Sequence, residues 1–485
     1  MSYSGKITMM LKKIVLLSIF AFLIFNLNAQ EAIIDVSKVK QVIDGFGAST
    51  AWHGQLTTPE ADAAFKNDKS NQMGLSILRV RIDPSSSWWN DEKQNAIRAK
   101  NRGAMILASP WSPPASMKTN NNTTGGELKP SSYADYAIHL KNFCSHLGNV
   151  DVVSLQNEPN IEVGYESCNW TPAQLLTFCK NNASAIGKPV MAPEAFNFDK
   201  NYSDPILNDS TANAHVQYIG GHLYGASAYN YTNAISKGKK VWMTEKYFNP
   251  DDIETCITMA KEITDCMYNN MNAYVWWYLR QPGCNLIEAG GKLKKKGFTM
   301  GQYSKFVRPG FNRVDATYQP KTKVYLVAFK GKDQNVVVVI NQNKNTVSQI
   351  FSFKNDTVFS VKKYVTSGSK NLNDEGTLKC TSNSFTDNLD AQSITTYVTS
   401  KIPTGNHTLK EPEIRIFPNP ASDIIQLSSI ENVTGWQVYD VLGKKFFTQK
   451  HPTSSVVGIS SLNSGIYIIR IQQKEKEYSF KFVKN

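Results

Sequence analysis

Two glutamates, Glu158 and Glu245, have the local sequence expected of paired catalytic carboxyls. Each stands at the C-terminal end of a short apolar run that we interpret as a buried strand. Two carboxyl groups facing each other across a cleft are the minimum machinery for breaking a glycosidic bond. A single glutamate at a strand end is more often a surface or ion-paired residue, so the prediction rests on the pair.

The elements that would position these glutamates are alternating strand-like and helix-like stretches between residues 42 and 280. By our count Glu158 follows the fourth strand and Glu245 the seventh. Eight such units predict an α/β chain folded as a (β/α)8 TIM barrel, whose catalytic residues lie at the C-terminal ends of its strands. The predicted strands cover residues 43–48, 77–82, 105–109, 152–157, 190–193, 218–223, 241–244 and 274–279.

The region after the barrel, residues 303–400, lacks helical periodicity and reads as a fused β-sandwich side domain. Its clearest strand-like runs cover residues 325–329, 336–341, 347–353 and 393–397. The barrel region is taken as residues 30–302, of which 30–40 are a candidate extra strand for the side domain.

Residues 401–413 are rich in chain-breaking and short polar residues and are interpreted as a linker. Beyond it, residues 414–485 predict a small all-β sandwich. Its expected strands cover residues 424–427, 436–440, 465–471 and 478–483.

The N-terminus has the pattern of a secretory signal peptide. Lys12 and Lys13 precede an apolar stretch at residues 14–25, and Ala29 is the expected cleavage point. A stretch of this length is short for a membrane span. We therefore predict that residues 1–29 are removed and that the mature protein is exported.

The chain carries 53 Lys and Arg against 40 Asp and Glu, a formal net charge of +13. Its basic residues are dispersed, apart from a cluster at residues 292–296, and no nucleic-acid-binding motif accompanies them, so we expect no nucleic-acid partner. A solvated basic surface, or one that favours polyanionic polysaccharides, remains open.

Seven cysteines are few for 485 residues and odd in number. No Cys-x-x-Cys pair suggests zinc. After export, Cys256 with Cys266 or Cys168 with Cys179 are candidate disulfides, and buried free thiols are an equal alternative.

Several side chains near the predicted strand ends are candidate substrate-binding residues. Asn157 could donate to a sugar hydroxyl beside Glu158, and Trp111 and Trp52 could stack on sugar rings or be core tryptophans. Because side chains alternate along a strand, one of Trp276 and Trp277 is expected to face the cavity, and Trp277 is the candidate.

Polar residues at two other strands are candidates for orienting the carboxyls. His222 and Tyr224, at the end of the sixth strand, could orient a carboxylate or be a satisfied polar pair. Arg79 and Arg81, on the second strand, are hard to bury without acidic partners. At least one of the two is expected to form an ion pair in the barrel mouth, and Arg81 is taken as the candidate ligand-binding residue.

Several ordered motifs resemble glycoside hydrolase family 30, and its bacterial glucuronoxylanase branch in particular. The resemblance covers residues 30–400. It implies a retaining endo-β-1,4-xylanase with Glu158 as acid/base and Glu245 as nucleophile, and a chemistry without metal or organic cofactor. The motifs are Gly-Phe-Gly-Ala-Ser at 45–49, Ser-Pro-Trp-Ser-Pro-Pro at 109–114, Gln-Asn-Glu-Pro at 156–159, Thr-Glu at 244–245, Ala-Tyr-Val-Trp-Trp-Tyr at 273–278 and Ser-Lys-Phe-Val-Arg-Pro-Gly at 304–310.

The chain departs from that branch after the eighth strand. The branch continues with two arginines, a serine and a tyrosine, and its second arginine and tyrosine grip a glucuronate branch. Here Arg280 matches the first arginine, while Gln281 and Gly283 replace the gripping pair. A glutamine lacks the charged, bidentate fork that suits a carboxylate. Strict glucuronate dependence is therefore not expected, although Lys292 and Lys294–Lys296 could restore some acidic preference.

The third unit resembles the C-terminal sorting domain of the type IX secretion route, which implies an outer-membrane secretion machinery as partner. The resemblance rests on Ile-Phe-Pro-Asn-Pro-Ala at 416–421, Val-Tyr-Asp-Val-Leu-Gly-Lys at 438–444 and Leu-Asn-Ser-Gly-Ile-Tyr at 462–467. We therefore expect a secreted or outer-membrane-surface monomer that acts on xylan or a related plant cell-wall polysaccharide. The alternatives are another family 30 activity (β-glucosidase, β-1,6-glucanase or glucosylceramidase) and a non-catalytic glycan-binding surface protein.

Overall fold

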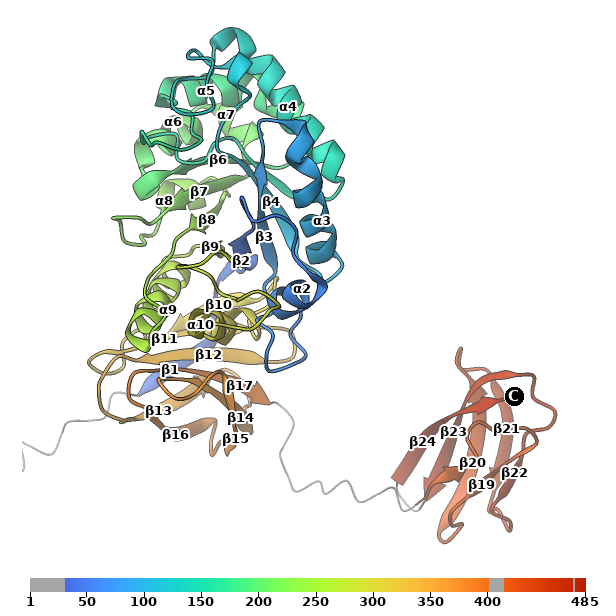
Figure 1. Cartoon of the computed structure of the whole chain (residues 1–485). Coiled ribbons are helices and arrows are strands. Elements are labelled where there is room, and N and C mark those ends of the chain that lie inside the picture. The colour runs from blue at the N-terminus through green and yellow to red at the C-terminus, as the bar shows by residue number, and fades with distance from the viewer. Residues whose placement is uncertain (1–30, 401–413, 474–475) are drawn as a thin grey trace, which may run out of the picture. The chain divides into compact units, whose positions relative to one another are not determined.

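The computed structural model describes residues 31–400, 414–473 and 476–485 of the chain (Figure 1). The expected signal peptide and linker lie outside these residues. The described chain forms two compact units: the first contains the barrel and the β-rich side domain, and the second contains the C-terminal strands.

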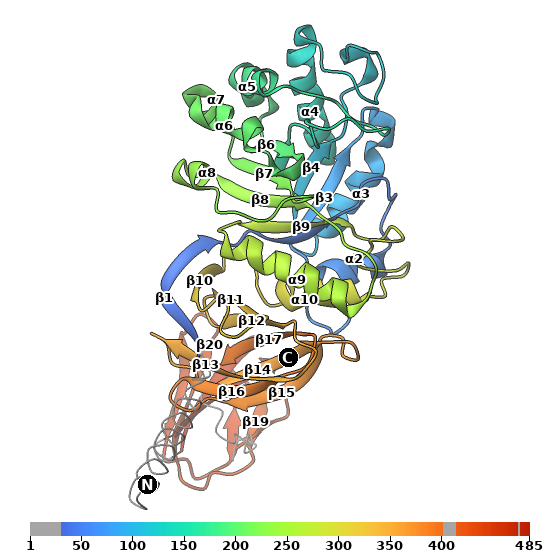
Figure 2. The same cartoon turned by 90° about the vertical axis from the view of Figure 1, so that its left-hand side faces the viewer.

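Eight parallel strands close into a barrel in the order β2 to β9, which confirms the predicted TIM-barrel fold (Figures 1 and 2). The fourth barrel strand, β5, is the shortest, because the chain leaves the sheet before Glu158. The strands are β2 (Gly45–Ser49), β3 (Ile77–Ile82), β4 (Met105–Pro110), β5 (Val152–Ser154), β6 (Val190–Ala195), β7 (Tyr218–His222), β8 (Lys240–Glu245) and β9 (Ala273–Tyr278).

Helices on the outside of the barrel begin and end at clear sequence signals. In α2 the N-cap Thr57 and Glu60 form a capping box, and α4 ends at Gly148, whose φ of 78° is the left-handed conformation that glycine favours. The α-helices are α2 (Thr58–Phe65), α3 (Trp89–Lys100), α4 (Tyr133–Leu147), α5 (Pro172–Asn181), α6 (Lys200–Asn208), α7 (Ser210–His215), α8 (Thr232–Ser236), α9 (Ile253–Tyr268) and α10 (Lys295–Ser304).

Short 3-10 helices occur in several of the connections. They are η1 (Ser86–Trp88), η2 (Ala115–Met117), η3 (Pro130–Ser132), η4 (Ala183–Ile186) and η5 (Phe196–Phe198). Three of them, η1, η2 and η5, follow barrel strands near the C-terminal face, where loops shape the site.

Inside the barrel, a small apolar cluster of buried side chains fills the end opposite the candidate site. It includes Leu107, Val152, Met191, Trp242 and Val275, each from a different barrel strand. Side chains layered in this way make the barrel interior a packed core rather than a channel. The polar residues discussed below lie further along the same strands.

The side domain is one nine-stranded sheet whose ends approach each other. Its order is β15-β14-β17-β12-β11-β10-β1-β13-β16, in which β1 (Ala32–Val42) pairs with β10 and β13. Tyr397 on β17 donates to Asp387 on β16 at 2.6 Å, so the two layers of the sandwich belong to one curled sheet. The other strands are β10 (Asn312–Ala316), β11 (Val324–Lys330), β12 (Asn335–Asn341), β13 (Val347–Lys354), β14 (Ser360–Thr366), β15 (Asn373–Lys379), β16 (Ser384–Leu389) and β17 (Ser393–Ser400).

The barrel and the side sheet share a core. Figures 1 and 2 both show α9 and α10 between them, and the largest apolar cluster combines residues of these helices with residues of β11 and β12. A hydrogen bond from Thr396 on β17 to Gln302 on α10, at 2.6 Å, links the two parts. The sheet therefore braces the barrel from below rather than lining its mouth.

The second unit contains a three-stranded and a four-stranded sheet around a separate apolar core, as an all-β unit requires. The smaller sheet has the order β18-β19-β22 and the larger β21-β20-β23-β24. The strands are β18 (Ile416–Phe417), β19 (Ile424–Leu427), β20 (Val433–Asp440), β21 (Lys445–Lys450), β22 (Val456–Gly458), β23 (Gly465–Gln473) and β24 (Lys476–Lys484).

All seven cysteines fall within the described ranges, and all are free thiols, six of them buried. The sequence left disulfides and free thiols as alternatives, and the structure has free thiols. Burial raises the pKa of Cys256 and of Cys168 to about 12, which keeps both protonated and unreactive. Across the described residues, no helix has the length and apolar character needed to cross a membrane.

Candidate active site

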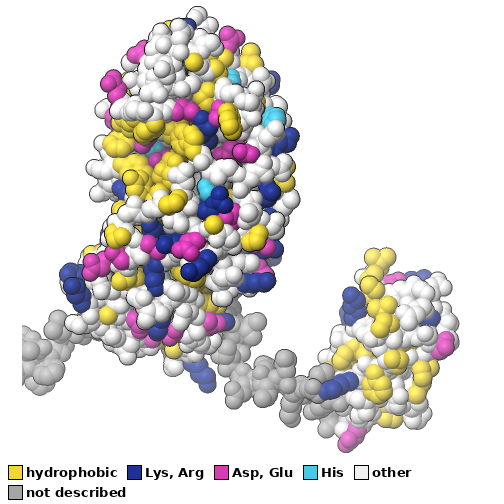
Figure 3. Space-filling view, viewed as in Figure 1, with side chains coloured by type: hydrophobic (Ala, Val, Ile, Leu, Met, Phe, Trp, Pro, Cys, Tyr) yellow, Lys and Arg dark blue, Asp and Glu magenta, His cyan; other side chains and the backbone are white. Residues whose placement is uncertain are grey.

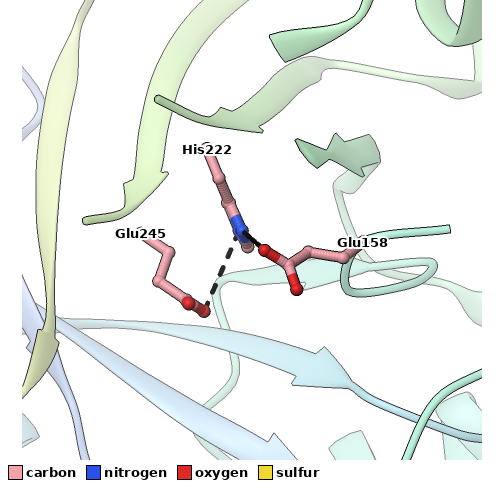
Figure 4. Close-up of side chains that lie close together, drawn as sticks. All are labelled: Glu158, His222 and Glu245. Carbon is pink, nitrogen blue, oxygen red and sulfur yellow. Dashed lines mark hydrogen bonds and ion pairs between the residues drawn. The ribbon is translucent and has the colours of Figure 1, made fainter. Parts of the chain in front are cut away.

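Glu158 and Glu245 lie together at the C-terminal end of the barrel. Glu245 is the last residue of β8, and Glu158 follows β5 in a turn where its φ is 44°. This left-handed conformation is unusual for a residue with a side chain and is typical of functional sites. Single oxygen atoms of the two carboxyls and one nitrogen of His222 lie within 4.8 Å of one another (Figure 4).

Glu245 is held by a buried arginine and a tyrosine. The Arg79 Nη1 donates to Glu245 Oε2 at 2.6 Å, and Tyr224 donates its hydroxyl to Oε1 at 3.0 Å. Arg79 has no exposed surface and also donates through Nη2 to Asn157 Oδ1 at 2.7 Å. The Asn157 amide nitrogen is thereby left as the group that can donate to a bound hydroxyl.

Glu158 has different partners. His222 Nδ1 lies 2.9 Å from Glu158 Oε1, and Tyr165 donates its hydroxyl to Oε2 at 3.2 Å. Figure 4 shows the imidazole of His222 between the two carboxyls. Its Nε2 lies 4.0 Å from Glu245 Oε2, beyond hydrogen-bond distance, so that interaction is electrostatic.

A third carboxyl, Glu194 at the end of β6, completes the charged cluster. Its Oε2 lies 3.1 Å from Arg79 Nη2 and 3.7 Å from His222 Nε2, with no exposed surface. Burial alone would raise the pKa of Glu194, but the charges of Arg79 and His222 lower it to about 2. Burial would likewise lower the pKa of His222, but Glu245 and Glu158 raise it to about 9. His222 is therefore an imidazolium at neutral pH.

The pKa of Glu245 is raised by its burial, and the positive charges of His222 and Arg79 oppose that rise. Both side chains that donate to Glu245 stabilise its ionised form. The contact with a permanently charged guanidinium makes Glu245 the natural site of a stable negative charge in the cleft.

Two carboxyls and an imidazole within 4.8 Å of one another have the spacing of metal ligands. Glu158, His222 and Glu245 could each offer one ligand atom. With Arg79 and the imidazolium of His222 in place, however, two cations already face the three carboxylates of the cluster. These two positive charges offset most of the negative charge of the cluster, so the residues do not favour a divalent cation.

Aromatic side chains form the walls of the cleft over these carboxyls, which has a volume of about 740 Å³. The Trp111 and Trp277 ring centroids lie 5.5 Å apart, and that of Trp52 lies 4.8 Å from Trp111. Figure 3 shows hydrophobic side chains gathered over this part of the barrel. The other aromatic lining residues are Tyr165, Phe196, Tyr224, Tyr247 and Tyr278. Such flat apolar surfaces beside hydrogen-bonding groups suit a sugar chain.

The structure decides between the members of two candidate pairs, the neighbouring tryptophans of β9 and the two arginines of β3. Trp277 lines the cleft, whereas Trp276 is fully buried and donates to the Cys284 carbonyl at 2.6 Å. Arg79 contacts Glu245. Arg81, the candidate chosen from the sequence, instead forms ion pairs with Asp83 and Glu166.

Arg280 lies away from the cleft wall. Its Nη1 donates to the buried Glu60 at 2.6 Å, and Gln281 donates to the Trp52 carbonyl at 3.4 Å. Of the lysines suggested as substitutes for the missing grip, Lys292 and Lys294 lie 3.6 Å and 3.4 Å from Glu288, and the other two are held by backbone carbonyls. Lys295 donates to the Ser367 carbonyl at 2.8 Å, and Lys296 is buried and donates to the Gly283 carbonyl at 3.1 Å.

Sequence reasoning missed Glu194 and the two tyrosines Tyr165 and Tyr247. The rule that found Glu158 and Glu245, a carboxylate at the end of a barrel strand, applies equally to Glu194. Glu194 directly follows the predicted fifth strand, 190–193, just as Glu245 follows the seventh, so this signal could have found it. The tyrosines lie in loops, and no local pattern in the sequence assigns them to the cleft.

Comparison with known proteins places this geometry in a family. The chain is 38% identical over 396 residues to the glucuronoxylanase XynC of Bacillus subtilis (strain 168), which covers 77% of this chain and 93% of the relative. The chain belongs to glycoside hydrolase family 30. It is therefore a glycoside hydrolase by family.

Two solved structures support the same assignment. The family 30 subfamily 8 xylanase Xyn30A from Clostridium acetobutylicum has a TM-score of 0.74 and 42% identity, covering 76% of this chain and all of that one (100%). A family 30 endoxylanase from Clostridium papyrosolvens C71 has a TM-score of 0.71 and 39% identity over the same shares, 76% and 100%. Residues 415–485 match the secretion system C-terminal sorting domain.

Proposed function

We propose that this family 30 member is an exported endo-β-1,4-xylanase that cleaves the xylan backbone with retention of configuration. In the first step Glu245 attacks the anomeric carbon, while Glu158 gives its proton to the leaving oxygen. In the second step Glu158 takes a proton from water, and that water displaces Glu245 from the sugar. Each step breaks one bond at the anomeric carbon and forms one.

The observation that carries the proposal is the facing pair Glu158 and Glu245 in an aromatic cleft. Their nearest carboxyl oxygens are within 4.8 Å. Retaining enzymes keep their two carboxyls about 5–5.5 Å apart, whereas inverting enzymes need about 6.5–9.5 Å to admit a water molecule. The short separation supports retention. The substrate is proposed by analogy with the xylanases that the chain resembles.

We also propose that a glucuronate branch is not required. Arg280 is bound to Glu60, and Gln281 and Gly283 offer no charged fork. Lys295 and Lys296 are held by backbone carbonyls. A uronate at this rim would therefore have to compete for cations that already have partners.

The export route is proposed from the two ends of the chain. Residues 1–29 have the signal-peptide pattern, and residues 415–485 match the sorting domain. Comparing the location of the full chain with that of a chain ending at residue 413 tests this. The full chain should reach the cell surface or medium, and the shortened chain should remain inside the outer membrane. Equal release of both would contradict the proposed route.

The substrate proposal is tested by side-by-side hydrolysis of glucuronoxylan, arabinoxylan and linear xylo-oligosaccharides, with product masses read out. We expect cleavage of all three. Cleavage of glucuronoxylan alone, with a glucuronate at a fixed position in every product, would contradict the proposed independence. Failure to cleave any of them would remove the xylanase proposal and favour another activity of the family.

A further inference from the structure

A second cavity, of about 440 Å³, lies beside the active-site cleft. Trp52 lines both cavities and is their common wall. The second cavity, here called the side pocket, is also lined by His53, Arg81, Asp83, Trp88, Asp91 and Glu92. The two cavities adjoin at this one residue, which is partly exposed, so a sugar chain that passes over Trp52 would reach the side pocket from the cleft.

Two tryptophans are exposed at the side pocket. Trp88 is 65% exposed and Trp52 is 40% exposed, which is unusual for side chains of this size. The neighbouring Trp89 is buried and donates to the Asp83 carbonyl at 2.8 Å. Trp88 is thus held at the surface by an anchored segment, the end of η1, rather than on an unsupported loop. A flat indole in this position can stack on a sugar ring.

The polar lining of the side pocket is firmly held. Glu92 accepts hydrogen bonds from Thr50 at 2.7 Å and Asn95 at 3.0 Å. Asp91 accepts one from Gln55 at 2.9 Å. Carboxylates fixed in this way offer acceptors of defined direction to sugar hydroxyls.

The balance of charge in the side pocket is negative. Its one arginine, Arg81, forms ion pairs with Asp83 and Glu166. Burial and the charge of Arg280 lower the pKa of His53 to about 4, so that histidine is neutral at pH 7. A buried nitrogen of His53, Nε2, has no hydrogen-bond partner among the described residues. Asp83 and Asp91 therefore face a ligand without a free cation beside them, whereas burial raises the pKa of Glu92.

We propose that the side pocket binds a neutral pentose unit of the polysaccharide whose backbone occupies the cleft, and that its carboxylates exclude a uronate. This inference rests on the proposed xylanase function. The tryptophans supply an apolar surface, the fixed carboxylates accept hydroxyl hydrogen bonds, and like charge repels an acidic branch. The pentose can come from either of two sources: a further xylose of the backbone or an arabinose branch.

The test compares wild type with Trp88→Ala on three oligosaccharides of equal backbone length: linear, arabinose-branched and glucuronate-branched. Ile138→Ala, on α4 and 50% exposed, is the matched surface control. We expect Trp88→Ala to lower kcat/KM about tenfold on at least one neutral substrate, as loss of one good aromatic contact does. A loss on the linear substrate identifies a backbone xylose, and a loss confined to the arabinose-branched one identifies a branch.

A second variant tests the charge argument without removing a large side chain. Asp91→Asn should raise kcat/KM for the glucuronate-branched substrate relative to the neutral ones by about threefold or more, as removal of one like charge nearby would. Unchanged kcat/KM of Trp88→Ala on both neutral substrates would overturn the side-pocket proposal and leave the xylanase proposal standing. A wild-type protein that cleaves none of the three would remove both.

Discussion

The ends of β8 and β5 carry the same side chain but hold it in different ways. At β8, Glu245 receives a guanidinium, Arg79, which keeps its charge at every accessible pH. At β5, Glu158 is held by His222 and Tyr165. The imidazole of His222 changes its charge when it gains or loses a proton, and the hydroxyl of Tyr165 can move its proton. Glu245 is the last residue of β8, whereas Glu158 lies in a turn where its φ is positive.

This difference gives each carboxyl the surroundings that its proposed role needs. A nucleophile must stay ionised, and a fixed positive charge achieves this. An acid/base must gain and lose a proton in each cycle, and a titratable neighbour tolerates that better than a fixed cation. Glu194 links the two ends, because it lies near both Arg79 and His222.

The largest effect should come from removing the fork that holds Glu245. In Arg79→Lys the charge remains, but one ammonium cannot serve Glu245, Asn157 and Glu194 together. We expect kcat to fall about 10³-fold, comparable with the loss of a strong electrostatic contact in other active sites.

The matched control for that variant is Arg102→Lys, because Arg102 pairs with Asp62 outside the cleft. Its kcat should stay within about twofold of wild type, since a partly exposed ion pair contributes little. A kcat for Arg79→Lys within a few-fold of wild type would show that the guanidinium is not what prepares Glu245.

A smaller effect is expected from the two tyrosines, each of which donates its hydroxyl to a different carboxyl. Tyr224→Phe removes a donor that favours ionised Glu245, so its pKa should rise further and the acidic limb of kcat should move to higher pH. We expect kcat to fall about 10–100-fold. Tyr165→Phe should leave the acidic limb in place, because that hydroxyl contacts Glu158. Equal shifts in both pH profiles would erase the contrast between the two ends.

Glu194→Gln should instead change the alkaline limb of the pH–rate profile. The pKa of His222 is raised to about 9, so its positive charge is present below that pH and is lost as pH rises through 9. Removing a nearby carboxylate lowers the pKa of His222, so activity should be lost at lower pH than in wild type. A pH–rate profile of each protein measures this, and identical alkaline limbs would remove Glu194 from the network.

The smallest effect concerns the stability of the folded protein and depends on Glu262, a residue of α9. Glu262 forms an ion pair with Lys246 at 3.6 Å and accepts a hydrogen bond from Tyr274 at 2.9 Å. Burial raises the pKa of Glu262 to about 7, so the folded protein binds a proton that the unfolded chain has already released. Stability from this group is therefore present below pH 4.5 and is lost as pH rises to 7, by up to about 3 kcal/mol.

Glu262→Gln removes that titration and should flatten the fall in thermal stability between pH 4.5 and 7. Melting temperatures of both proteins at the two ends of this window give the comparison. Because Lys246 would remain, the absolute stability can change at either pH, and the difference between the two slopes is the relevant quantity. Parallel slopes would mean that Glu262 is ionised in the folded protein throughout.

The sequence predicted the barrel and its two glutamates because both signals are local. A short apolar run followed by a polar residue is visible without any knowledge of packing. The choice between Arg79 and Arg81 is not local, since residues two apart on a strand point to the same face and only depth in the barrel separates them. Arg79 reaches Glu245, whereas Arg81 lies nearer the rim beside Trp52, 4.8 Å from its ring.

The strands of the side domain show the same limit. β15 is almost wholly exposed, so its residues carry no apolar alternation for a pattern to detect. β16 has only two buried positions among six. Both lie at the ends of the sheet order, where pairing on one side is enough to hold a strand and sequence pattern is weakest.

The most direct test of the account is chemical rescue of Glu245→Ala with azide, followed by the configuration of the product. The account predicts a loss of nearly all turnover, recovery of activity with azide, and a glycosyl azide of inverted configuration, because the small anion replaces the missing carboxylate. Glu158→Gln under the same conditions should not give that inverted product. A folded Glu245→Ala protein that azide fails to rescue, or that gives a product of retained configuration, would contradict the assignment of Glu245 as nucleophile.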